Sequence, residues 1–188
     1  YNSTSTEDKG VLFVGGNDGM LHAFKAIDGT EIFAYVPNQV FANLNNLADP
    51  DYVHKYYVDL TPYSAAVGTQ TLLVGGLGKG GKGFYCLDIT DLSDITTALE
   101  NKENPTAELK AAAKIKGKYP STPGSDPDLG YTFSRPYIAN SYAGEVVIAG
   151  NGYNSANGNA ILYILNPETG TVLKKIDTLS GTCNGLST

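Results

Sequence analysis

The stretch VGGNDGMLHAFKAIDGTEIFAYVP, residues 14–37, decides the fold because it holds two tight turns and the apolar segments beside them. It continues the apolar segment GVLFVGG (10–16), which is typical of a buried β-strand. The tripeptide NDG (17–19) and the dipeptide DG (28–29) accept the positive φ that tight hairpin turns require. The stretch therefore predicts a three-stranded antiparallel meander over residues 11–36.

Two later segments repeat the arrangement of an apolar strand, a glycine-rich turn and a second strand. They are QTLLVGGLGKGGKGFYCLDIT (70–90) and EVVIAGNGYNSANGNAILYILNPETGTVLKKI (145–176), and further candidate strands precede them at 61–67 and 134–141. Four short antiparallel strands per unit is the pattern of a β-propeller blade. We therefore predict an all-β fold, a β-propeller-like segment of about three four-stranded antiparallel blades with short helical insertions, forming one partial propeller domain over residues 1–188. The blade-like units are expected at 11–36, 61–100 and 132–177.

Two longer segments separate these units and are expected to be insertions, over residues 37–60 and 101–131. The first contains an apolar-periodic stretch at 40–47, which predicts one or two helical turns begun by Pro37. The second contains TAELKAAAK (106–114), a strong helix-forming sequence. Long excursions of this kind are unusual in compact domains and are places where function tends to lie.

A glycine marks each unit where its apolar run ends, at Gly15, Gly75 and Gly150. The second of these leads into GLGKGGKG (76–83), which satisfies the G-x-G-x-x-G pattern of a nucleotide-binding loop. A phosphate site of that kind needs a helix N-terminus after the loop, whereas the following FYCLDIT is a strand pattern. We therefore interpret the loop as a flexible blade hairpin.

The charge of the chain excludes one class of partner. The formal net charge is −6, and no cluster of lysine and arginine is larger than a pair. Because an electrostatic grip on nucleic acid needs a basic face, we expect no nucleic-acid partner. We also expect no transmembrane segment, since no apolar run approaches the length that spans a bilayer. Cys86 and Cys183 are either disulfide-bonded or two buried free thiols, and their spacing does not decide between the two.

No residue is assigned a catalytic, cofactor-binding or metal-binding role from the sequence. His22 and His54 are the only histidines, and we interpret both as structural or hydrogen-bonded surface residues. Asp126 and Asp128 alternate as in a calcium loop, but Pro127 intervenes and no third acid follows, so we expect no cofactor or metal in this fragment. Tyrosines suit either packing between blades or protein contact surfaces. They include Tyr52, Tyr56, Tyr57, Tyr63, Tyr119, Tyr131, Tyr137, Tyr142 and Tyr153.

Six motifs taken together resemble one family. They are GGNDGMLHAF, DGTEIFAYVP, HKYYVDLTP, LLVGGLGKGGKGFYCLDIT, LGYTFSRPYIA and GNGYNSANGNAILYILNPETG. From about Val11 to the C-terminus, in the same order, they look like the C-terminal β-propeller of the PilC/PilY-type type IV pilus biogenesis proteins. In that family a calcium loop rich in alternating aspartates follows the NGLS segment (184–187). The resemblance therefore places such a loop beyond residue 188 and assigns none of its ligands to this chain.

The resemblance implies a non-enzymatic adhesion and assembly module that promotes pilus extension against retraction, surface attachment and twitching motility. Its implied partners are pilin or minor pilins and a host or surface receptor, and its implied location is extracellular, at the pilus tip or the outer-membrane surface. One alternative is a quinone-dependent dehydrogenase propeller, in which a tryptophan closes each repeat. This chain has no tryptophan and has Phe33 at that place in the first repeat. A second alternative is a scaffold propeller of an envelope assembly complex. We also expect contacts with neighbouring blades or chains, because the first unit lacks a preceding strand.

Overall fold

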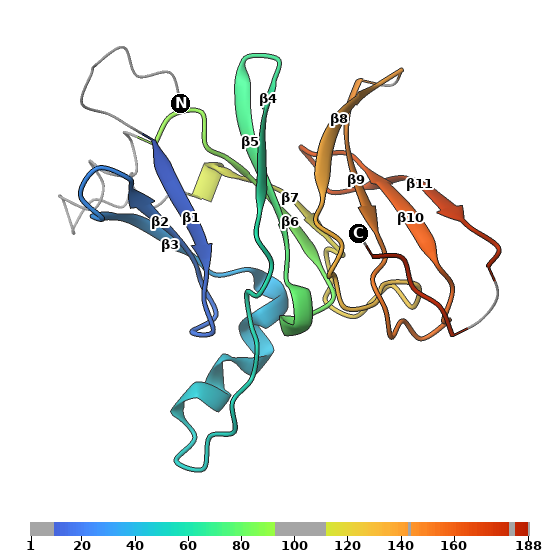
Figure 1. The fold of residues 1–188 in the computed structure, drawn as a ribbon, viewed down its shortest axis with the longest axis horizontal. Coiled ribbons are helices and arrows are strands. Elements are labelled where there is room, and N and C mark those ends of the chain that lie inside the picture. The colour runs from blue at the N-terminus through green and yellow to red at the C-terminus, as the bar shows by residue number, and fades with distance from the viewer. Residues whose placement is uncertain (1–9, 93–111, 143, 181–182, 188) are drawn as a thin grey trace.

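The computed structural model describes residues 10–92, 112–142, 144–180 and 183–187, and there the protein consists of three antiparallel β-sheets with few helical turns. The sheets lie side by side in chain order, from blue through green to orange in Figure 1. This is the all-β, blade-like arrangement that the repeated strand pattern predicts.

The first sheet is the meander expected from the opening stretch, with the strand order β1–β2–β3. Gly19, in the turn between β1 and β2, has φ +93°, and Gly29, in the turn between β2 and β3, has φ +75°. A side chain disfavours this left-handed region of the backbone, which explains the glycines at both turns. The strands are β1 (Val11–Gly15), β2 (Leu21–Lys25) and β3 (Glu31–Tyr35).

The second sheet has the order β4–β5–β6–β7, and its last strand corrects the sequence interpretation. Residues 115–119, which we expected inside an insertion over 101–131, form β7 and pair with β6. Their sequence IKGKY was missed because two lysines and a glycine do not indicate a strand, although lysines are tolerated at a sheet edge. Most of TAELKAAAK lies outside the described residues. The strands are β4 (Tyr63–Val67), β5 (Gln70–Gly76), β6 (Phe84–Asp88) and β7 (Ile115–Tyr119).

The third sheet has the order β8–β9–β10–β11 and shows the four strands expected between residues 132 and 177. Gly144, the first residue of β9, has φ +93°, and Gly170, in the tight turn before β11, has φ +70°. The second and third sheets therefore share one strand order, in which β4 and β8 come first. The strands are β8 (Tyr137–Ser141), β9 (Gly144–Gly150), β10 (Ile161–Leu165) and β11 (Val172–Asp177).

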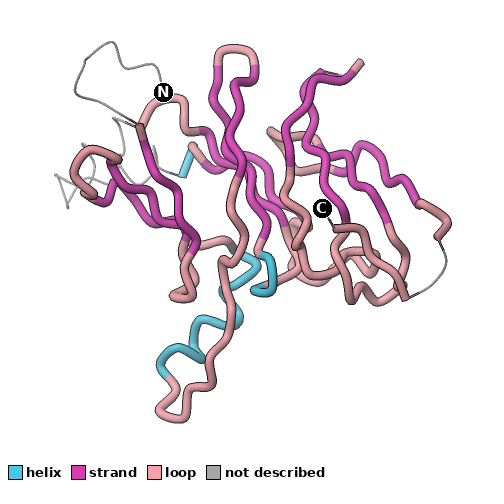
Figure 2. Tube along the Cα trace, in the orientation of Figure 1, coloured by secondary structure: helices cyan, strands magenta, loops and turns pink. Residues whose placement is uncertain are grey.

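Between the first two sheets the chain forms a 3-10 helix, η1 (Asn38–Ala48). It begins directly after Pro37 and includes the stretch for which helical turns were predicted. This helix and the residues after it project from the sheets (Figures 1 and 2). We call residues 38–57 the arm. Among the described helices, none has the length and apolar character that would let it cross a membrane.

Two apolar layers fill the spaces between neighbouring sheets. Side chains alternate between the two faces of a strand, so β5 serves both layers: Leu73 packs toward the first sheet, and Leu72 and Val74 pack toward the third. Cys86 is buried in the second layer, whereas Cys183 is exposed, and both thiols are free. The two cysteines are therefore neither bonded to each other nor both buried.

A backbone crossing explains the glycine that ends the apolar run of each unit. A Cβ atom added at Gly15 would lie 2.3 Å from the carbonyl oxygen of Val58, and one at Gly150 would lie 2.3 Å from that of Leu186. In the second unit the equivalent residue is Gly76, whose added Cβ would lie 2.9 Å from the carbonyl oxygen of Thr132. The segments with Val58 and Thr132 lead from one unit into the next, and the segment with Leu186 follows the third unit. Only glycine leaves room for so close a backbone approach.

Candidate functional site

The loops that follow β5, β7 and β9 meet at the end of the sheets from which the arm projects (Figure 1). The loop after β7 pairs with the loop after β9, because the amide of Tyr131 donates to the carbonyl oxygen of Tyr153 at 2.8 Å. The loop after β5 is bound to the same region, since the amide of Leu77 donates to the hydroxyl of Thr132 at 2.9 Å. We call this end of the molecule the loop face.

The glycine-rich loop after β5 packs tightly and lies between the arm and Thr132. A Cβ atom added at Gly80 would lie 1.7 Å from the carbonyl oxygen of Tyr57, so the arm lies directly against this loop. Gly78 is buried, has φ +57° and begins a single 3-10 turn, η2 (Gly78–Gly80). Strand β6 follows at Phe84 and pairs with β5, so the loop connects a hairpin as predicted and precedes no helix N-terminus.

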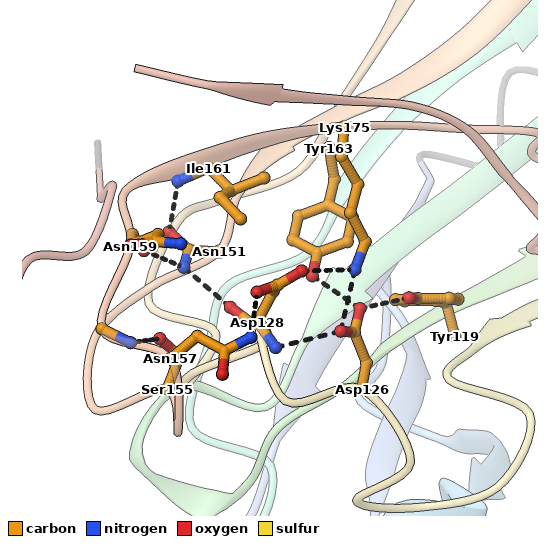
Figure 3. Close-up of polar contacts among 11 residues, drawn as sticks. Tyr119, Asp126, Asp128, Asn151, Ser155, Asn157, Asn159, Ile161, Tyr163 and Lys175 are labelled. Atoms are coloured by element: carbon orange, nitrogen blue, oxygen red, sulfur yellow. Dashed lines mark hydrogen bonds and ion pairs between the residues drawn. The ribbon is translucent and has the colours of Figure 1, made fainter. Parts of the chain in front are cut away.

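A network of charged and phenolic groups holds the loop after β7 against the third sheet (Figure 3). Asp126 is at its centre, and its side chain is only 6% exposed. Its carboxylate accepts hydrogen bonds from the hydroxyls of Tyr119 and Tyr163, the latter at 2.6 Å. The ammonium of Lys175 lies 2.8 Å from Asp126 Oδ1 and 2.8 Å from Asp128 Oδ2. The network therefore joins β7, β10 and β11 to one loop.

The electrostatics of the network favour its charged form. Burial by itself raises the pKa of Asp126, but hydrogen bonds from Lys175, Tyr119 and Tyr163 outweigh burial and hold that pKa below its ordinary value. The hydrogen bond from Lys175 likewise lowers the pKa of Asp128. Burial lowers the pKa of Lys175, yet the two carboxylates together raise it. The ammonium therefore lies where a bound cation would neutralise the aspartate pair.

Two asparagines complete the attachment of this loop. Asn151 is fully buried, and its amide nitrogen donates to the carbonyl oxygens of Asp128 and Asn159 at 2.8 and 2.7 Å. Its side-chain oxygen accepts from the backbone amides of Ile161 and Leu186, both at 3.0 Å. Asn157 donates to Asp128 Oδ1 at 2.6 Å. The acid-free run NGYNSANGN thus supplies structural amides, a role that the sequence did not reveal.

The loop face contains a groove of about 460 Å³, which we call the aromatic groove. One side carries Tyr131 and Tyr153, whose ring centroids are 6.3 Å apart, and Phe133 stacks on Tyr153 at 4.9 Å. The arm supplies His54 and Tyr56, whose rings meet edge to face at 5.0 Å. The lining residues are Asn43, His54, Lys55, Tyr56, Tyr57, Lys79, Gly80, Tyr131 and Tyr153.

Lysines accompany these rings. The ammonium of Lys79 lies 4.4 Å from the centroid of the Tyr56 ring. That of Lys82 lies 5.5 Å from the Tyr131 centroid and donates to the carbonyl oxygen of Asn154 at 2.6 Å. Contacts of this kind are attractive because the face of an aromatic ring is negative. The groove therefore combines ring faces with positive charge.

The structure separates the two histidines that the sequence singled out. His22 lies on the first sheet, with Nδ1 2.6 Å from Glu31 and Nε2 2.8 Å from Asp18. The hydrogen bond to Glu31 is the main reason that the pKa of His22 is raised. His54 lines the aromatic groove instead. Within the described residues, no group of three or more histidine, cysteine and acidic side chains is placed to hold a metal ion.

Comparisons with known proteins identify the family. A family model described as the PilY1 β-propeller domain matches residues 2–188. The chain is 42% identical over 185 residues to a type IV pilus biogenesis factor PilY1 homologue of Xylella fastidiosa, covering 96% of this chain and 11% of that protein. It is 38% identical over 187 residues to the type IV pilus biogenesis factor PilY1 of Pseudomonas aeruginosa strain UCBPP-PA14, covering 94% of this chain and 14% of that protein.

A solved structure shows the same fold. The crystal structure of the Pseudomonas aeruginosa PilY1 C-terminal domain superimposes with a TM-score of 0.66 at 33% sequence identity, and the match covers 94% of this chain and 32% of that one. The chain thus spans a small part of the length of its curated relatives and about a third of the solved domain. With three blade-like sheets and a family match along nearly its whole length, the chain belongs to the PilY1 β-propeller family of type IV pilus biogenesis factors.

Proposed function

We propose that this chain is the propeller part of a non-enzymatic, type IV pilus-associated module that promotes pilus extension, surface attachment and twitching motility. The observation that carries the proposal is the relation to PilY1 proteins at 38–42% identity along almost the whole chain. The loop face supports it, since exposed tyrosines on a rigid scaffold suit contact with partners. We place the module outside the cell, at the pilus tip or the outer-membrane surface, with pilin or minor pilins and a surface receptor as partners.

The two alternative functions have less support. A quinone-dependent dehydrogenase would need a cofactor site, and the chain has no tryptophan to close its repeats. The glycine-rich loop, the most suggestive cofactor motif in the sequence, packs against the arm. A scaffold propeller of an envelope assembly complex remains compatible with the fold, but the family match favours the pilus.

The experiment compares strains that lack the gene with strains complemented by the full-length protein, with and without pilus retraction. If the protein promotes extension against retraction, loss of the gene should abolish surface pili and twitching in retracting cells and should leave pili on cells that cannot retract. Surface attachment should fall in parallel with the pili in retracting cells. Normal piliation in the retracting mutant would contradict the proposal.

A second experiment tests whether the propeller contributes to this function. Full-length protein carrying Lys175→Met loses the ion pairs to Asp126 and Asp128, and Lys174→Met on the same strand serves as the matched control. With the amount of surface protein measured in each strain, the first variant should complement less well than the second. An absorbance spectrum and a dye-reduction assay on the purified protein test the dehydrogenase alternative, and a bound quinone would support that alternative.

A further inference from the structure

The aromatic groove is built entirely from segments outside the β-strands. Its lining comes from η1, the end of the arm, the η2 turn, and the loops carrying Tyr131 and Tyr153. These segments are firmly placed: Gly80 lies against the backbone of Tyr57, and the Tyr57 hydroxyl donates to the carbonyl oxygen of Asn43 at 3.0 Å. A groove whose walls are fixed in this way is preorganised for a ligand, and its volume of about 460 Å³ is in the range of small-molecule sites.

The rings in the groove are accessible. Tyr153 is 50% exposed although Phe133 stacks on it, and Tyr56 is 37% exposed. Among the described residues that line the groove none has an aliphatic side chain, so the apolar surface that they offer is aromatic. Flat ring faces suit a ligand with a flat apolar face of its own.

The charge of the groove is opposite to that of the protein. The whole chain has a formal net charge of −6, yet the lining residues include Lys55 and Lys79 and no carboxylate. Lys79 is exposed and packs on the Tyr56 ring, and Lys82 lies over the neighbouring Tyr131 ring. Local positive charge in an acidic protein favours an anionic ligand at this place.

Two features favour a sugar over a peptide as that anionic ligand. A pyranose ring presents a face of C–H bonds that stacks on a tyrosine, and a uronic acid carries a carboxylate beside that face. An acidic peptide would bind by adding a strand, by inserting an apolar anchor or by pairing its carboxylates with a cluster of arginines. Among the described residues that line it, the groove has no strand edge, no aliphatic pocket and no arginine.

We propose that the aromatic groove binds acidic carbohydrate, with Tyr56 and Tyr153 stacking on the sugar rings and Lys79 pairing with a carboxylate. The proposal rests on the proposed role in surface attachment, to which it adds the class of ligand that the chain binds. The binding test uses purified protein, so its failure would leave the piliation and twitching experiments unaffected.

The experiment is calorimetric titration of the purified full-length protein with four probes. Two are acidic hexasaccharides, of α-1,4-linked galacturonate and of β-1,4-linked mannuronate. The third is the methyl ester of the first, which has the same rings without charge, and the fourth is hexaglutamate. At least one acidic sugar should bind with a Kd below about 1 mM, and binding should weaken as salt rises. The methyl ester and hexaglutamate should each bind at least about tenfold more weakly.

Variants assign the binding to the groove. Lys79→Ala and Tyr153→Ala should each weaken binding by about tenfold, and Tyr153→Phe, which keeps the ring, should bind within about twofold of the wild type. Lys174→Ala and the exposed Tyr142→Ala lie outside the groove and should bind normally. The circular dichroism spectrum of each variant checks its fold.

Three results would overturn the proposal. They are binding of neither acidic sugar at concentrations up to about 10 mM, equal binding of hexaglutamate, and equal binding by the groove and control variants. Equal binding of hexaglutamate would show that the groove recognises negative charge without preferring a sugar to a peptide.

Discussion

At the scale of single residues, Lys175 joins strand β11 to the loop after β7 through two ion pairs. Its ammonium reaches two aspartates that precede it in the chain by 49 and 47 positions, and it lies 5.2 Å from the centroid of the Tyr163 ring. Removing it would leave Asp126, at 6% exposure, as a buried carboxylate without its cation. An uncompensated buried charge is among the more costly defects in a protein.

Replacing Lys175 by methionine should lower the free energy of unfolding by about 2 kcal/mol at neutral pH, because the aspartate charges lose their partner. Lys174→Met on the same strand should change it by less than about 0.5 kcal/mol. Urea denaturation of both variants measures the difference. Equal stability of the two variants would show that the ion pairs contribute nothing.

The difference in stability between Lys175→Met and Lys174→Met should depend on pH. The pKa of Asp126 is lowered by folding, so its contribution is present above the unfolded value near 3.8 and is lost as pH falls through the folded pKa. The pKa of Lys175 is raised, so its contribution is present below the unfolded value near 10.5 and is lost as pH rises through the folded pKa. The difference between the variants should therefore be largest between these limits and should vanish in acid.

The position of Lys175 also affects whether the chain can bind calcium. Its ammonium already neutralises Asp126 and Asp128, which were the nearest approach to a calcium loop in the sequence. We predict that the 188-residue chain binds calcium no more tightly than about 1 mM, the range of weak extracellular sites. Calorimetric titration tests this, with Lys175→Met as the comparison. A micromolar site in the wild type would contradict the prediction and would direct attention to the aspartate pair.

His22 should make stability depend on pH in the opposite direction to a lone carboxylate. Its pKa is raised, chiefly by the hydrogen bond to Glu31, so its stabilising contribution is complete below 6.5 and is lost as pH rises through the folded pKa. His22→Gln should therefore lower the Tm most at about pH 5.5 and least at about pH 8.5. His54→Gln, whose ring packs on Tyr56, is the control. Thermal melts across this range would refute the prediction if the His22 effect did not change.

At the scale of elements, the hairpin turns and the backbone crossings explain the glycines. Gly19 and Gly29 both have positive φ, but their surroundings differ. A Cβ atom at Gly19 would lie 2.4 Å from the Leu44 side chain in the arm, whereas one at Gly29 would have nothing within 4 Å. The first hairpin therefore also positions the arm, which forms one side of the aromatic groove.

Valine substitutions at Gly19 and Gly29 distinguish the cost of backbone strain from the cost of steric crowding. Gly29→Val should lower the free energy of unfolding by about 1 kcal/mol, the cost of a side chain at positive φ. Gly19→Val should lower it by more, about 2 to 3 kcal/mol, because the side chain also collides with Leu44. Chemical denaturation of the two variants measures the difference. Unchanged stability of Gly19→Val would contradict its assignment to a tight turn.

At the scale of the whole molecule, the three sheets differ in their number of described strands, with three in the first and four in each of the others. The second and third each begin with a strand, β4 or β8, that the first sheet does not have within the described residues. Among the described strands, β1 therefore lies at the edge of its sheet, with Leu12 at 55% and Val14 at 51% exposure. Unpaired edges with apolar side chains recruit further strands.

We predict that the 188-residue chain associates in solution through this edge, burying more than about 1,000 Å² if the association is stable. Light scattering over a concentration series measures the molar mass of the particles in solution. A longer chain that contains more of the propeller is the control. Leu12→Lys combined with Val14→Lys should reduce association, because charge on an edge strand opposes pairing. A chain that stays monomeric and folded at high concentration would show that the edge is covered internally.

The sequence by itself determined the local features of this protein. Hairpin turns depend on neighbouring residues, so NDG and DG predicted both turns of the first sheet, and the repeated strand pattern predicted the blade-like units. The helical turns at 40–47 were also predicted, because the apolar periodicity that indicates them is a local pattern. Strand β7 was missed because IKGKY owes its pairing to its neighbour β6 and to the packing of Gly117, whose added Cβ would lie 2.6 Å from the carbonyl oxygen of Pro167.

Only the tertiary structure decided the loop face. The bonds from Lys175 to Asp126 and Asp128, and the buried amide of Asn151, join residues far apart in the chain, and no local pattern predicts which of them meet. The aromatic groove brings together Asn43 and Tyr153 in the same way, although each tyrosine alone was compatible with simple packing. Such contacts depend on how whole sheets pack, since a side chain's neighbours across a sheet boundary are set by the register and twist of every strand between them.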